Sequence, residues 1–416
     1  MKNSKNKSFK KGIITIVAIL IGFLLIMAKS VTWPEKNILP PMGWEPWNID
    51  HCGQLSNWDE AYYRKLADFF VSSGLRDLGY TYLTFECHAH YRDSDGVFRP
   101  NLSKFPNGLK PINDYLHSKG LKSRTYTDAG KGKCGGCYDG DGSFGHYADD
   151  AKRWAEFGFD GVKIDWCGGA GEKLDEKTQY MEFHKEMAAQ NPDFNIEICT
   201  WGKGNPWEWG RDAGTFWRTG DDIDGYIENG KWSDASGGSW KTITRNIDAN
   251  RHPDRKLVGP GLGWNYPDML EVGKSGGLNE TEERTQFSMW CIMASPLFLG
   301  NDVLNMPPYA REIVMNKEMI AIDQDPLGIQ GDVAKEYNNG TLQVWVKELV
   351  DGAKAVALFN RSEKAEKISA VWKDLGFAGR VKVRDLCEHA DKGIFPENYS
   401  VEVPSHAVVV IKVSRP

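Results

Sequence analysis

The chain has 416 residues, of which 41% are hydrophobic, so it is long enough to bury one large core and a smaller second one. The formal net charge of -6, without a long run of Lys or Arg after residue 11, argues against a surface that binds nucleic acid. Sixteen Trp is a high count, as expected where flat rings stack on sugars, although large barrels also bury many aromatic residues.

The first 30 residues differ in character from the rest of the chain. Lysines between Lys2 and Lys11 precede the apolar run IITIVAILIGFLLIMA, and small residues follow at Ala28 and Ser30. This order is typical of a signal peptide, so residues 1–30 are predicted to direct export and to lie outside the fold. A retained N-terminal membrane anchor is the alternative. We therefore expect a protein that is secreted or anchored to the outer face of the cytoplasmic membrane.

Residues 31–330 alternate short apolar runs with longer stretches of helical periodicity, such as AYYRKLADFFVSSGLRDLG and YADDAKRWAEFGF. This alternation is typical of βαβ units and a parallel sheet. Eight strands are expected, the number that closes a (β/α)₈ TIM barrel, in the segments PPMGWEPW, YTYLTFE, LKSRTYTD, GVKIDW, NIEICTW, TFWRTGD, KLVGPG and CIMASPLFLG.

Residues 331–416 have an all-β pattern, with Val-rich or alternating runs such as GTLQVWVKEL, AKAVALFN and HAVVVIKV separated by turn residues. These runs predict a C-terminal antiparallel β-sandwich. Its expected role is to pack against the barrel, and carbohydrate binding is the alternative.

Candidate catalytic residues follow the strands, because a barrel of this kind forms its active site at the carboxyl ends of its strands. A strand-end carboxylate taken alone is more often a helix cap than a catalyst. Retaining cleavage of a glycoside requires two carboxyl groups about 5 to 5.5 Å apart. The expected strands end in Glu86, Asp128, Asp165 and the pair Asp221 and Asp222, of which Asp165 and Asp222 can supply the two carboxyls.

Cations lie close to both of these carboxylates in the sequence. Lys163 is two residues before Asp165, and Arg218 is four before Asp222. Since residues i and i+2 of a strand face the same side, Lys163 and Asp165 should both point into the mouth of the barrel. Lys163 would then keep the carboxylate ionised and donate to sugar hydroxyls. A structural ion pair inside the barrel is the alternative for Lys163.

Several ordered segments resemble the alpha-galactosidase and alpha-N-acetylgalactosaminidase family of glycoside hydrolases, family 27. The resemblance covers most of the chain after the N-terminal segment and runs through PPMGWEPWN, YTDAG, GFDGVKIDWC, WRTGDDID, GPGLGWNYPDMLEVG, MWCIMASPLFLGNDV and IDQDPLG. It implies a (β/α)₈ barrel followed by a β-sandwich, a retaining mechanism, no metal or organic cofactor, and an oligosaccharide or glycan as substrate.

The resemblance also implies roles for residues within its motifs. The KxD segment makes Asp165 the nucleophile and Lys163 a substrate-binding residue. The WRxxxD segment makes Asp222 the acid/base and Arg218 a sugar ligand. Asp165 would attack the anomeric carbon, and Asp222 would protonate the departing oxygen.

Further residues are implied around this pair. Trp44 falls near the aromatic residue that lines the sugar pocket of the family, and Tyr126 matches a pocket tyrosine. Cys134 and Cys167 fall where the family has a disulfide beside the nucleophile. Cys134 and Cys137 form a CxxC pair, but no second pair follows, so a zinc site is not expected.

The first departure from the family pattern lies after the second expected strand. Where the family carries two consecutive Asp that grip galactose, this chain has Glu86 followed by Cys87. Glu86 is expected to keep a substrate-binding role, and His88 or His90 could compensate for the missing carboxylate. A second disulfide between Cys52 and Cys87 is a weaker inference, because Cys87 lies in this divergent segment.

Two more departures concern the sugar. Thr200 stands where alpha-galactosidases have a Glu, and N-acetylgalactosaminidases have a small hydroxyl residue there, so Thr200 is expected to bind substrate. Trp166 replaces a small residue after the nucleophile and could either reshape the pocket floor or face the surrounding helices.

The sequence therefore predicts an enzyme that removes terminal alpha-galactosyl residues from oligosaccharides or glycans. N-acetylgalactosamine, beta-L-arabinopyranose and isomaltose units of dextran remain alternative substrates on the same scaffold. A non-catalytic carbohydrate-binding protein is the alternative class, and retention of both Asp165 and Asp222 argues against it.

Overall fold

The computed structural model describes residues 39–51, 58–86, 89–132, 134, 142–228, 231–234, 238–254, 257–274 and 276–416. The chain divides into two units, Met1–Asn37 and Ile38–Pro416, and the second is the subject of this section. The expected signal peptide or anchor lies outside the described residues. Within them, no helix is long and apolar enough to cross a membrane.

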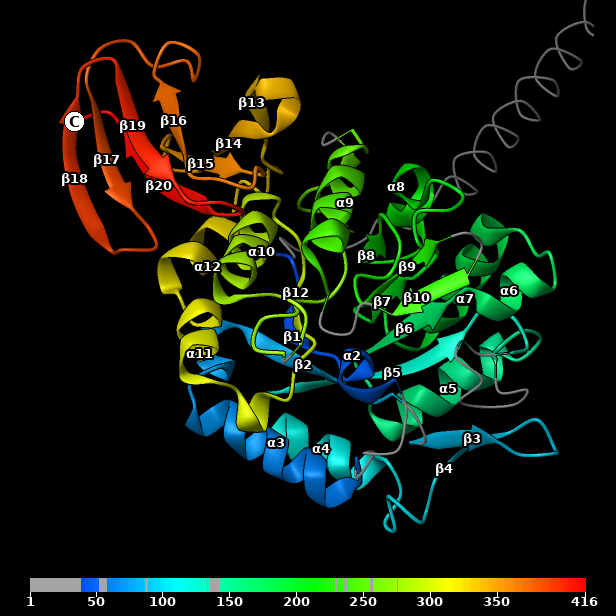
Figure 1. Cartoon of the computed structure of the whole chain (residues 1–416). Helices are drawn as coiled ribbons and strands as arrows, with labels where there is room; N and C mark the ends of the chain where they lie inside the picture. Colours follow the sequence, from blue (N-terminus) through cyan, green and yellow to red (C-terminus); the bar gives the residue numbers. More distant parts are fainter. Residues whose placement is uncertain are drawn as a thin grey trace, which may run out of the picture. The chain divides into compact units, whose positions relative to one another are not determined.

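Eight parallel strands form the central sheet, which confirms the predicted TIM-like barrel (Figure 1). In the order β11-β8-β7-β6-β5-β2-β1-β12, barrel strands that follow one another along the chain are neighbours in the sheet. Leu270, just after β11, bridges to Leu299 of β12 and joins the two ends of the sheet. The strands are β1 (Met42–Trp44), β2 (Tyr80–Thr84), β5 (Lys122–Asp128), β6 (Gly161–Asp165), β7 (Asn195–Ile198), β8 (Phe216–Arg218), β11 (Trp264–Tyr266) and β12 (Leu297–Leu299).

The prediction of a strand at KLVGPG is wrong. Gly259 pairs with Gly263 in an isolated antiparallel bridge, and β11 begins only at Trp264. The cause is local, because Gly259, Gly261 and Gly263 all have positive φ angles, between 75° and 135°, that are incompatible with a continuous strand. A tight turn therefore occupies the place of the expected strand, and GWNY supplies the barrel strand instead.

Helices cover the outside of the barrel, and several of them begin at a side chain that caps the N-terminus. The side chain of Asp59 caps α3, and the pairs Ser239 with Thr242 and Asn279 with Glu282 form capping boxes at α9 and α10. The helices are α2 (Trp47–Asp50), α3 (Glu60–Ser72), α4 (Lys110–Ser118), α5 (Tyr147–Phe157), α6 (Cys167–Gly171), α7 (Glu176–Gln190), α8 (Pro206–Trp209), α9 (Trp240–Arg251), α10 (Glu280–Ile292), α11 (Pro308–Val314) and α12 (Lys317–Asp323). Two hairpins, β3 (His90–Arg92) with β4 (Phe98–Pro100) and β9 (Gly225–Glu228) with β10 (Lys231–Asp234), extend from the loops.

The alternation of each strand sorts its side chains between the helices and the barrel interior. On β6, Val162 and Ile164 join the large core beneath the helices, whereas Lys163 and Asp165 line a pocket. Part of the interior is filled by a separate apolar cluster that includes Phe216, Trp264, Tyr266 and Phe298. The rest carries buried charged groups, and this polar region positions the site.

The C-terminal strands form the predicted antiparallel sandwich. One sheet has the order β13-β14-β15-β20-β17-β18, and the second pairs β16 with β19. The strands are β13 (Asp332–Tyr337), β14 (Leu342–Glu348), β15 (Lys354–Asn360), β16 (Glu366–Val371), β17 (Val381–Asp385), β18 (Ala390–Phe395), β19 (Asn398–Val403) and β20 (Val408–Ser414).

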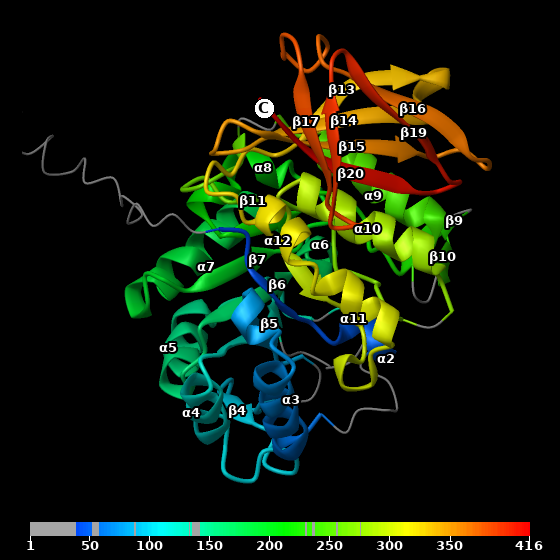
Figure 2. The same ribbon diagram turned by 90° about the vertical axis from the view of Figure 1, so that its left-hand side faces the viewer.

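Alternate residues of β15 show how the sandwich packs. Val356 and Leu358 join the core between the two sheets, whereas Ala355, Ala357 and Phe359 join the core shared with the barrel helices. Figure 2 shows the larger sheet beside α10 and α12. The packing role expected for this segment is therefore what the structure shows.

Candidate active site

A pocket of about 360 Å³ opens at the carboxyl ends of the barrel strands. Such a position is where a parallel barrel places its functional groups. Its lining combines carboxylates, cations, aromatic rings and sulfur atoms, contributed by Trp47, Asn48, His51, Tyr126, Cys134, Lys163, Asp165, Cys167, Cys199, Trp201, Arg218, Asp222, Asp224, Asp268 and Met269.

Asp165 ends β6 and lies deep in this pocket, with 7% of its surface exposed. The Tyr126 hydroxyl donates a hydrogen bond of 2.9 Å to its Oδ2, and the backbone N–H of Trp166 donates one of 3.3 Å to Oδ1. Burial raises the pKa of the Asp165 carboxyl, and the charge of Asp222 adds to this effect, whereas the Lys163 ammonium opposes it. The carboxylate is thus oriented by donors and held in a largely dry environment.

Asp222 follows β8 and is more open to solvent, with 31% of its side chain exposed. The guanidinium of Arg218 lies 3.0 Å from Asp222 and 3.0 Å from Asp268, so it bridges the two carboxylates. Because Asp165 is deep and Asp222 lies nearer the mouth, one carboxylate is placed against the buried end of a ligand and the other where a ligand leaves the pocket.

Asp268 is a pocket residue that the sequence interpretation did not single out. Its Oδ2 accepts a hydrogen bond of 2.8 Å from the backbone N–H of Ile223, which ties the loop after β11 to the loop after β8. Its φ of 89° is unusual for a residue other than Gly, and such backbone strain is often found at functional sites. Burial raises its pKa to about 6, against the opposing charge of Arg218.

The position of Lys163 is compatible with both interpretations that the sequence left open. It lines the pocket, as expected of a substrate-binding residue. It also forms a buried ion pair with Glu45 and donates a hydrogen bond of 3.1 Å to Glu86. Glu86 itself is buried and is absent from the pocket lining, so it contacts the site through Lys163.

The expectation that Trp44 lines the pocket is wrong. Its ring is fully buried against α3, within 6.4 Å of the rings of Trp58, Tyr62 and Tyr63, and its Nε1 donates to the carbonyl of Asn301. On β1, the side chain of Trp44 points outward, toward the helices. The next Trp in the same motif, Trp47 of α2, lines the pocket instead.

The expected substrate contact of Thr200 is also wrong. Thr200 is buried, and its hydroxyl donates to the carbonyl of Lys203 at 2.9 Å, inside the turn that follows β7. Its neighbours Cys199 and Trp201 face the pocket, because the alternation of β7 continues through this turn. Thr200 therefore gives no support to an acetamido-binding pocket.

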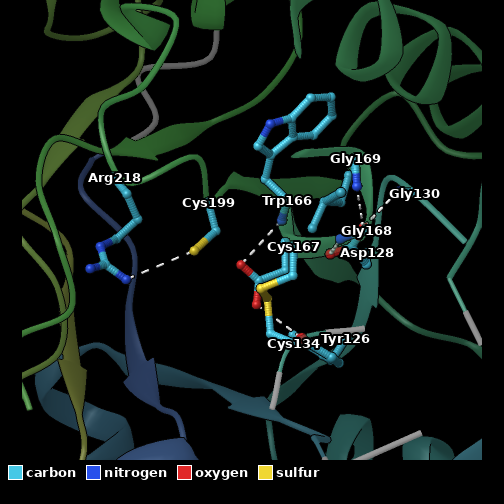
Figure 3. The surroundings of a disulfide bond; sticks show 12 residues. Tyr126, Asp128, Gly130, Cys134, Trp166, Cys167, Gly168, Gly169, Cys199 and Arg218 are labelled. Atoms are coloured by element: carbon cyan, nitrogen blue, oxygen red, sulfur yellow. Dashed lines mark hydrogen bonds between the residues drawn. A yellow bond between two sulfur atoms is a disulfide. The ribbon is translucent and has the colours of Figure 1, made fainter. Parts of the chain in front are cut away.

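Cys134 and Cys167 form a disulfide at the edge of the pocket, the pairing that the resemblance implies, with 5.2 Å between their Cα atoms (Figure 3). The ring of Trp166 points away from this disulfide and packs against Tyr180 of α7, so it faces the helices rather than the pocket floor. Cys52 and Cys87 lie outside the described residues.

Asp128, at the end of β5, anchors the backbone around this disulfide. Its carboxylate accepts hydrogen bonds from the N–H groups of Gly130, Gly168 and Gly169 (Figure 3). Within the described part of the chain, Asp128 and the two cysteines are the one group close enough together to hold a metal ion. Their sulfur atoms are joined in the disulfide, which removes the thiolates that zinc prefers.

Two side-chain bridges tie α2 to other loops, and neither was predicted. His51 Nε2 contacts the carboxylate of Asp224, and Asn48 Nδ2 donates to Glu271. These residues have no motif of their own, so the sequence offered only their proximity to GWEPWN and GDDID as a signal. His90, proposed as a substitute for the missing carboxylate, is buried in β3 and bonded to Thr125, and His88 lies outside the described residues.

A (β/α)₈ barrel with strand-end carboxylates around a pocket, followed by a sandwich packed on its helices, defines the class of protein as a glycosidase. A family model described as Alpha galactosidase A matches residues 39–325, and one described as the alpha galactosidase C-terminal beta sandwich domain matches residues 339–413. The chain belongs to the alpha-galactosidase family, glycoside hydrolase family 27.

Individual relatives agree with this assignment. The chain is 38% identical to the alpha-galactosidase of Cyamopsis tetragonoloba, over 88% of this chain and 84% of the relative. It is 34% identical to alpha-galactosidase A of Cellvibrio japonicus, over 98% of this chain and 99% of the relative. The crystal structure of alpha-galactosidase I from Mortierella vinacea superposes with a TM-score of 0.80 at 31% identity, covering 91% of this chain and 97% of that chain.

Proposed function

We propose that this enzyme removes terminal alpha-galactosyl residues from oligosaccharides or glycans by double displacement. The observation that carries the proposal is the pairing of a buried Asp165, oriented by Tyr126, with a more exposed Asp222 in one pocket. The curated relatives named as alpha-galactosidases support the choice of sugar. Thr200, the residue that favoured N-acetylgalactosamine, does not line the pocket.

In the first step, an Asp165 carboxylate oxygen attacks the anomeric carbon while the bond to the leaving oxygen breaks. Asp222, in its protonated form, gives its proton to that oxygen, so the aglycone departs as a neutral alcohol. Arg218 lies against Asp222 and stabilises the carboxylate that this transfer leaves behind. The product of the step is a galactosyl ester of Asp165.

In the second step, water enters from the mouth of the pocket and attacks the same carbon. Asp222 takes a proton from this water, and the ester bond to Asp165 breaks. Two inversions give net retention at the anomeric carbon. The solvent exposure of Asp222 fits this step, because the group that activates water must be reached by water.

A panel of p-nitrophenyl glycosides tests the proposal. It covers alpha-galactose, alpha-N-acetylgalactosamine, beta-L-arabinopyranose and alpha-glucose. We expect the largest kcat/KM with alpha-galactose, and we expect Asp165→Asn to lower it by at least about 10³-fold, because the nucleophile is removed.

The acid/base role is tested separately with Asp222→Asn. This variant should lose more activity on raffinose-type oligosaccharides than on the p-nitrophenyl galactoside, whose leaving group needs little protonation. Undiminished turnover by Asp165→Asn, or no release from any glycoside by the unaltered enzyme, would contradict the proposal.

We also propose that the enzyme is exported. The support is the Lys-rich start followed by an apolar run and small residues in the first 30 positions. N-terminal sequencing of the mature protein from its producing cell tests this, and a protein that retains all these residues in the cytoplasm would contradict it.

A further inference from the structure

Five ionisable side chains lie inside the barrel beneath the pocket; the two proposed steps use none of them, and only Lys163 lines the pocket. They come from consecutive strands, all are buried, and we call them the charged cluster: Glu45, Glu86, Arg124, Lys163 and Glu197. Charges with so little access to water are costly unless they are paired. The roles of the five side chains therefore depend on which carboxylate pairs with which cation.

The cluster divides into two linked pairs. Arg124 contacts Glu197, and its other nitrogen lies 3.8 Å from Glu45. Lys163 contacts Glu45 and lies 3.1 Å from Glu86. Glu45 thus lies between the two cations. The N–H of Glu45 donates to the carbonyl of Leu299, so its backbone is fixed by the pairing of β1 with β12.

Glu45, rather than Glu86, supplies the negative charge opposite Lys163. Burial would raise the pKa of Glu45, but Lys163 and Arg124 outweigh it and hold the pKa below its ordinary value. Burial raises the pKa of Glu86 to about 8, with Lys163 opposing and Glu45 adding to the rise. At neutral pH, Glu45 is therefore ionised and Glu86 is largely protonated.

We propose that Glu45 is a positioning residue for sugar recognition, which holds the Lys163 ammonium so that one of its N–H groups points into the pocket. An ammonium has three N–H groups, of which one donates to Glu86, and the Glu45 carboxylate lies against the ammonium as its ion-pair partner. Lys163 also lines the pocket, so the remaining N–H is placed to donate to one hydroxyl oxygen of the bound sugar. This inference rests on the proposed galactosidase activity and identifies what orients its substrate.

A Lys side chain has several rotatable bonds, and without a fixed partner it would hold this geometry only part of the time. A buried carboxylate fixed at the end of β1, across the barrel interior from β6, removes that freedom. The same geometry predicts which substitution matters, because Glu→Gln at position 45 keeps the shape of the side chain and removes the charge that fixes the ammonium.

Monodeoxy analogues of p-nitrophenyl alpha-galactoside test the inference. In the unaltered enzyme, removal of the hydroxyl that meets Lys163 should lower kcat/KM by about 10- to 100-fold, the usual range for a hydrogen bond to a charged group. In Lys163→Met the same removal should cost little. In Glu45→Gln, removal of the same hydroxyl should also lower kcat/KM only slightly. For the parent galactoside, this variant should raise KM by a larger factor than it lowers kcat.

Glu283→Gln is the matched control, because it makes the same change at a Glu bonded to the N–H of Gly273, outside the pocket lining. It should keep the sensitivity of the unaltered enzyme to every hydroxyl. If Glu45→Gln keeps that sensitivity too, Glu45 has only a structural role and the inference is wrong. Failure of the unaltered enzyme to cleave the galactoside would instead overturn the proposed function.

Should Glu45→Gln fail to fold, the double variant Glu45→Gln with Lys163→Met decides the question. It removes both members of the buried ion pair, which is tolerated better than removal of one. If Glu45 acts through Lys163, the double variant should match Lys163→Met in kcat/KM. A further loss of about tenfold or more in the double variant would overturn the inference.

Discussion

Whether a residue of this site faces the pocket depends on its position in its strand, because successive side chains of a strand point to opposite faces. Lys163 and Asp165 were predicted to share a face two residues apart, and both line the pocket. The same rule explains the two wrong assignments. Trp44 faces the helices, whereas the next residue, Glu45, faces the barrel interior. Thr200 is buried, whereas its neighbours Cys199 and Trp201 line the pocket. A motif locates a segment, but the phase of its strand decides which side chain meets the ligand.

The two tryptophans of GWEPWN should therefore respond differently to substitution. Trp47→Ala removes a partly buried ring from the pocket, so kcat/KM for p-nitrophenyl alpha-galactoside should fall, and the melting temperature should fall less than in Trp44→Ala. Trp44→Ala empties a fully buried site among aromatic rings and should lower the free energy of unfolding by about 3 to 5 kcal/mol. Steady-state kinetics and chemical unfolding measure the two effects.

A reversed pattern would contradict this placement. If Trp44→Ala were stable with a raised KM and Trp47→Ala had unaltered kinetics, Trp44 rather than Trp47 would be the residue that contacts the substrate.

Whole elements were predicted better than their ends and their contacts. Most of the barrel strands and outer helices lie where periodicity placed them, because burial on a fixed face leaves a strong pattern. The prediction of a strand at KLVGPG failed because its two glycines, Gly259 and Gly261, have positive φ angles that break the extended conformation. The bridges that tie α2 to other loops could not be predicted, since His51 and Asp224 are far apart in sequence and meet only when the barrel closes.

The bridge between His51 and Asp224 joins α2, which carries Trp47, to the loop that carries Asp222. About a third of the His51 side chain is exposed, whereas Asp224 is buried and its pKa is held below its ordinary value by its bond to His51 against the effect of burial. His51→Ala should therefore loosen both loops and lower kcat/KM by about tenfold or more.

His117→Ala is the matched control for this prediction. His117 forms a similar pair with Asp160, at 2.8 Å, but it lies on α4 and does not line the pocket. Its kcat/KM should equal that of the unaltered enzyme. Equal kinetics in the two variants would show that the bridge between His51 and Asp224 does not position the site.

At the scale of the whole molecule, the sandwich and the barrel are joined by polar bridges as well as by a shared core. Arg361 pairs with Asp248 of α9, and His406 pairs with Glu282 of α10. The C-terminal strands were recognisable from their composition, but these bridges depend on how the two parts meet. They lie away from the lining of the catalytic pocket, which is consistent with a supporting role for the sandwich.

Buried carboxyl groups throughout the molecule give its stability a predictable dependence on pH. Burial is the main cause in each case, and it raises the pKa of Glu86 to about 8, those of Asp128, Glu197 and Glu271 to about 7, and that of Asp268 to about 6. In the unfolded chain, these groups titrate near pH 4. Between about pH 4 and 8 the folded protein therefore binds more protons than the unfolded chain.

Because the folded state binds the additional protons, the free energy of unfolding should fall as pH rises through this window. Each proton of difference contributes about 1.4 kcal/mol per pH unit. Below about pH 4 the trend should reverse, since pairs such as Asp351 with Lys412, in which the pKa of Asp351 is lowered, lose their charge there. Melting temperatures measured from pH 3 to 9 should thus be highest near pH 4 to 5.

Asp128→Asn isolates one contribution to this curve. An amide at this position does not titrate, so the variant should lose less stability than the unaltered protein between pH 4 and 7, where Asp128 becomes charged beneath the disulfide. The amide oxygen can still accept from the N–H groups of Gly130 and Gly169, which bond the same carboxylate oxygen, so the fold should be retained. A melting temperature that rises steadily from pH 5 to 8 in the unaltered protein would contradict this prediction. It would show that burial does not raise the pKa of these carboxyl groups, and that the interior is more hydrated than its packing indicates.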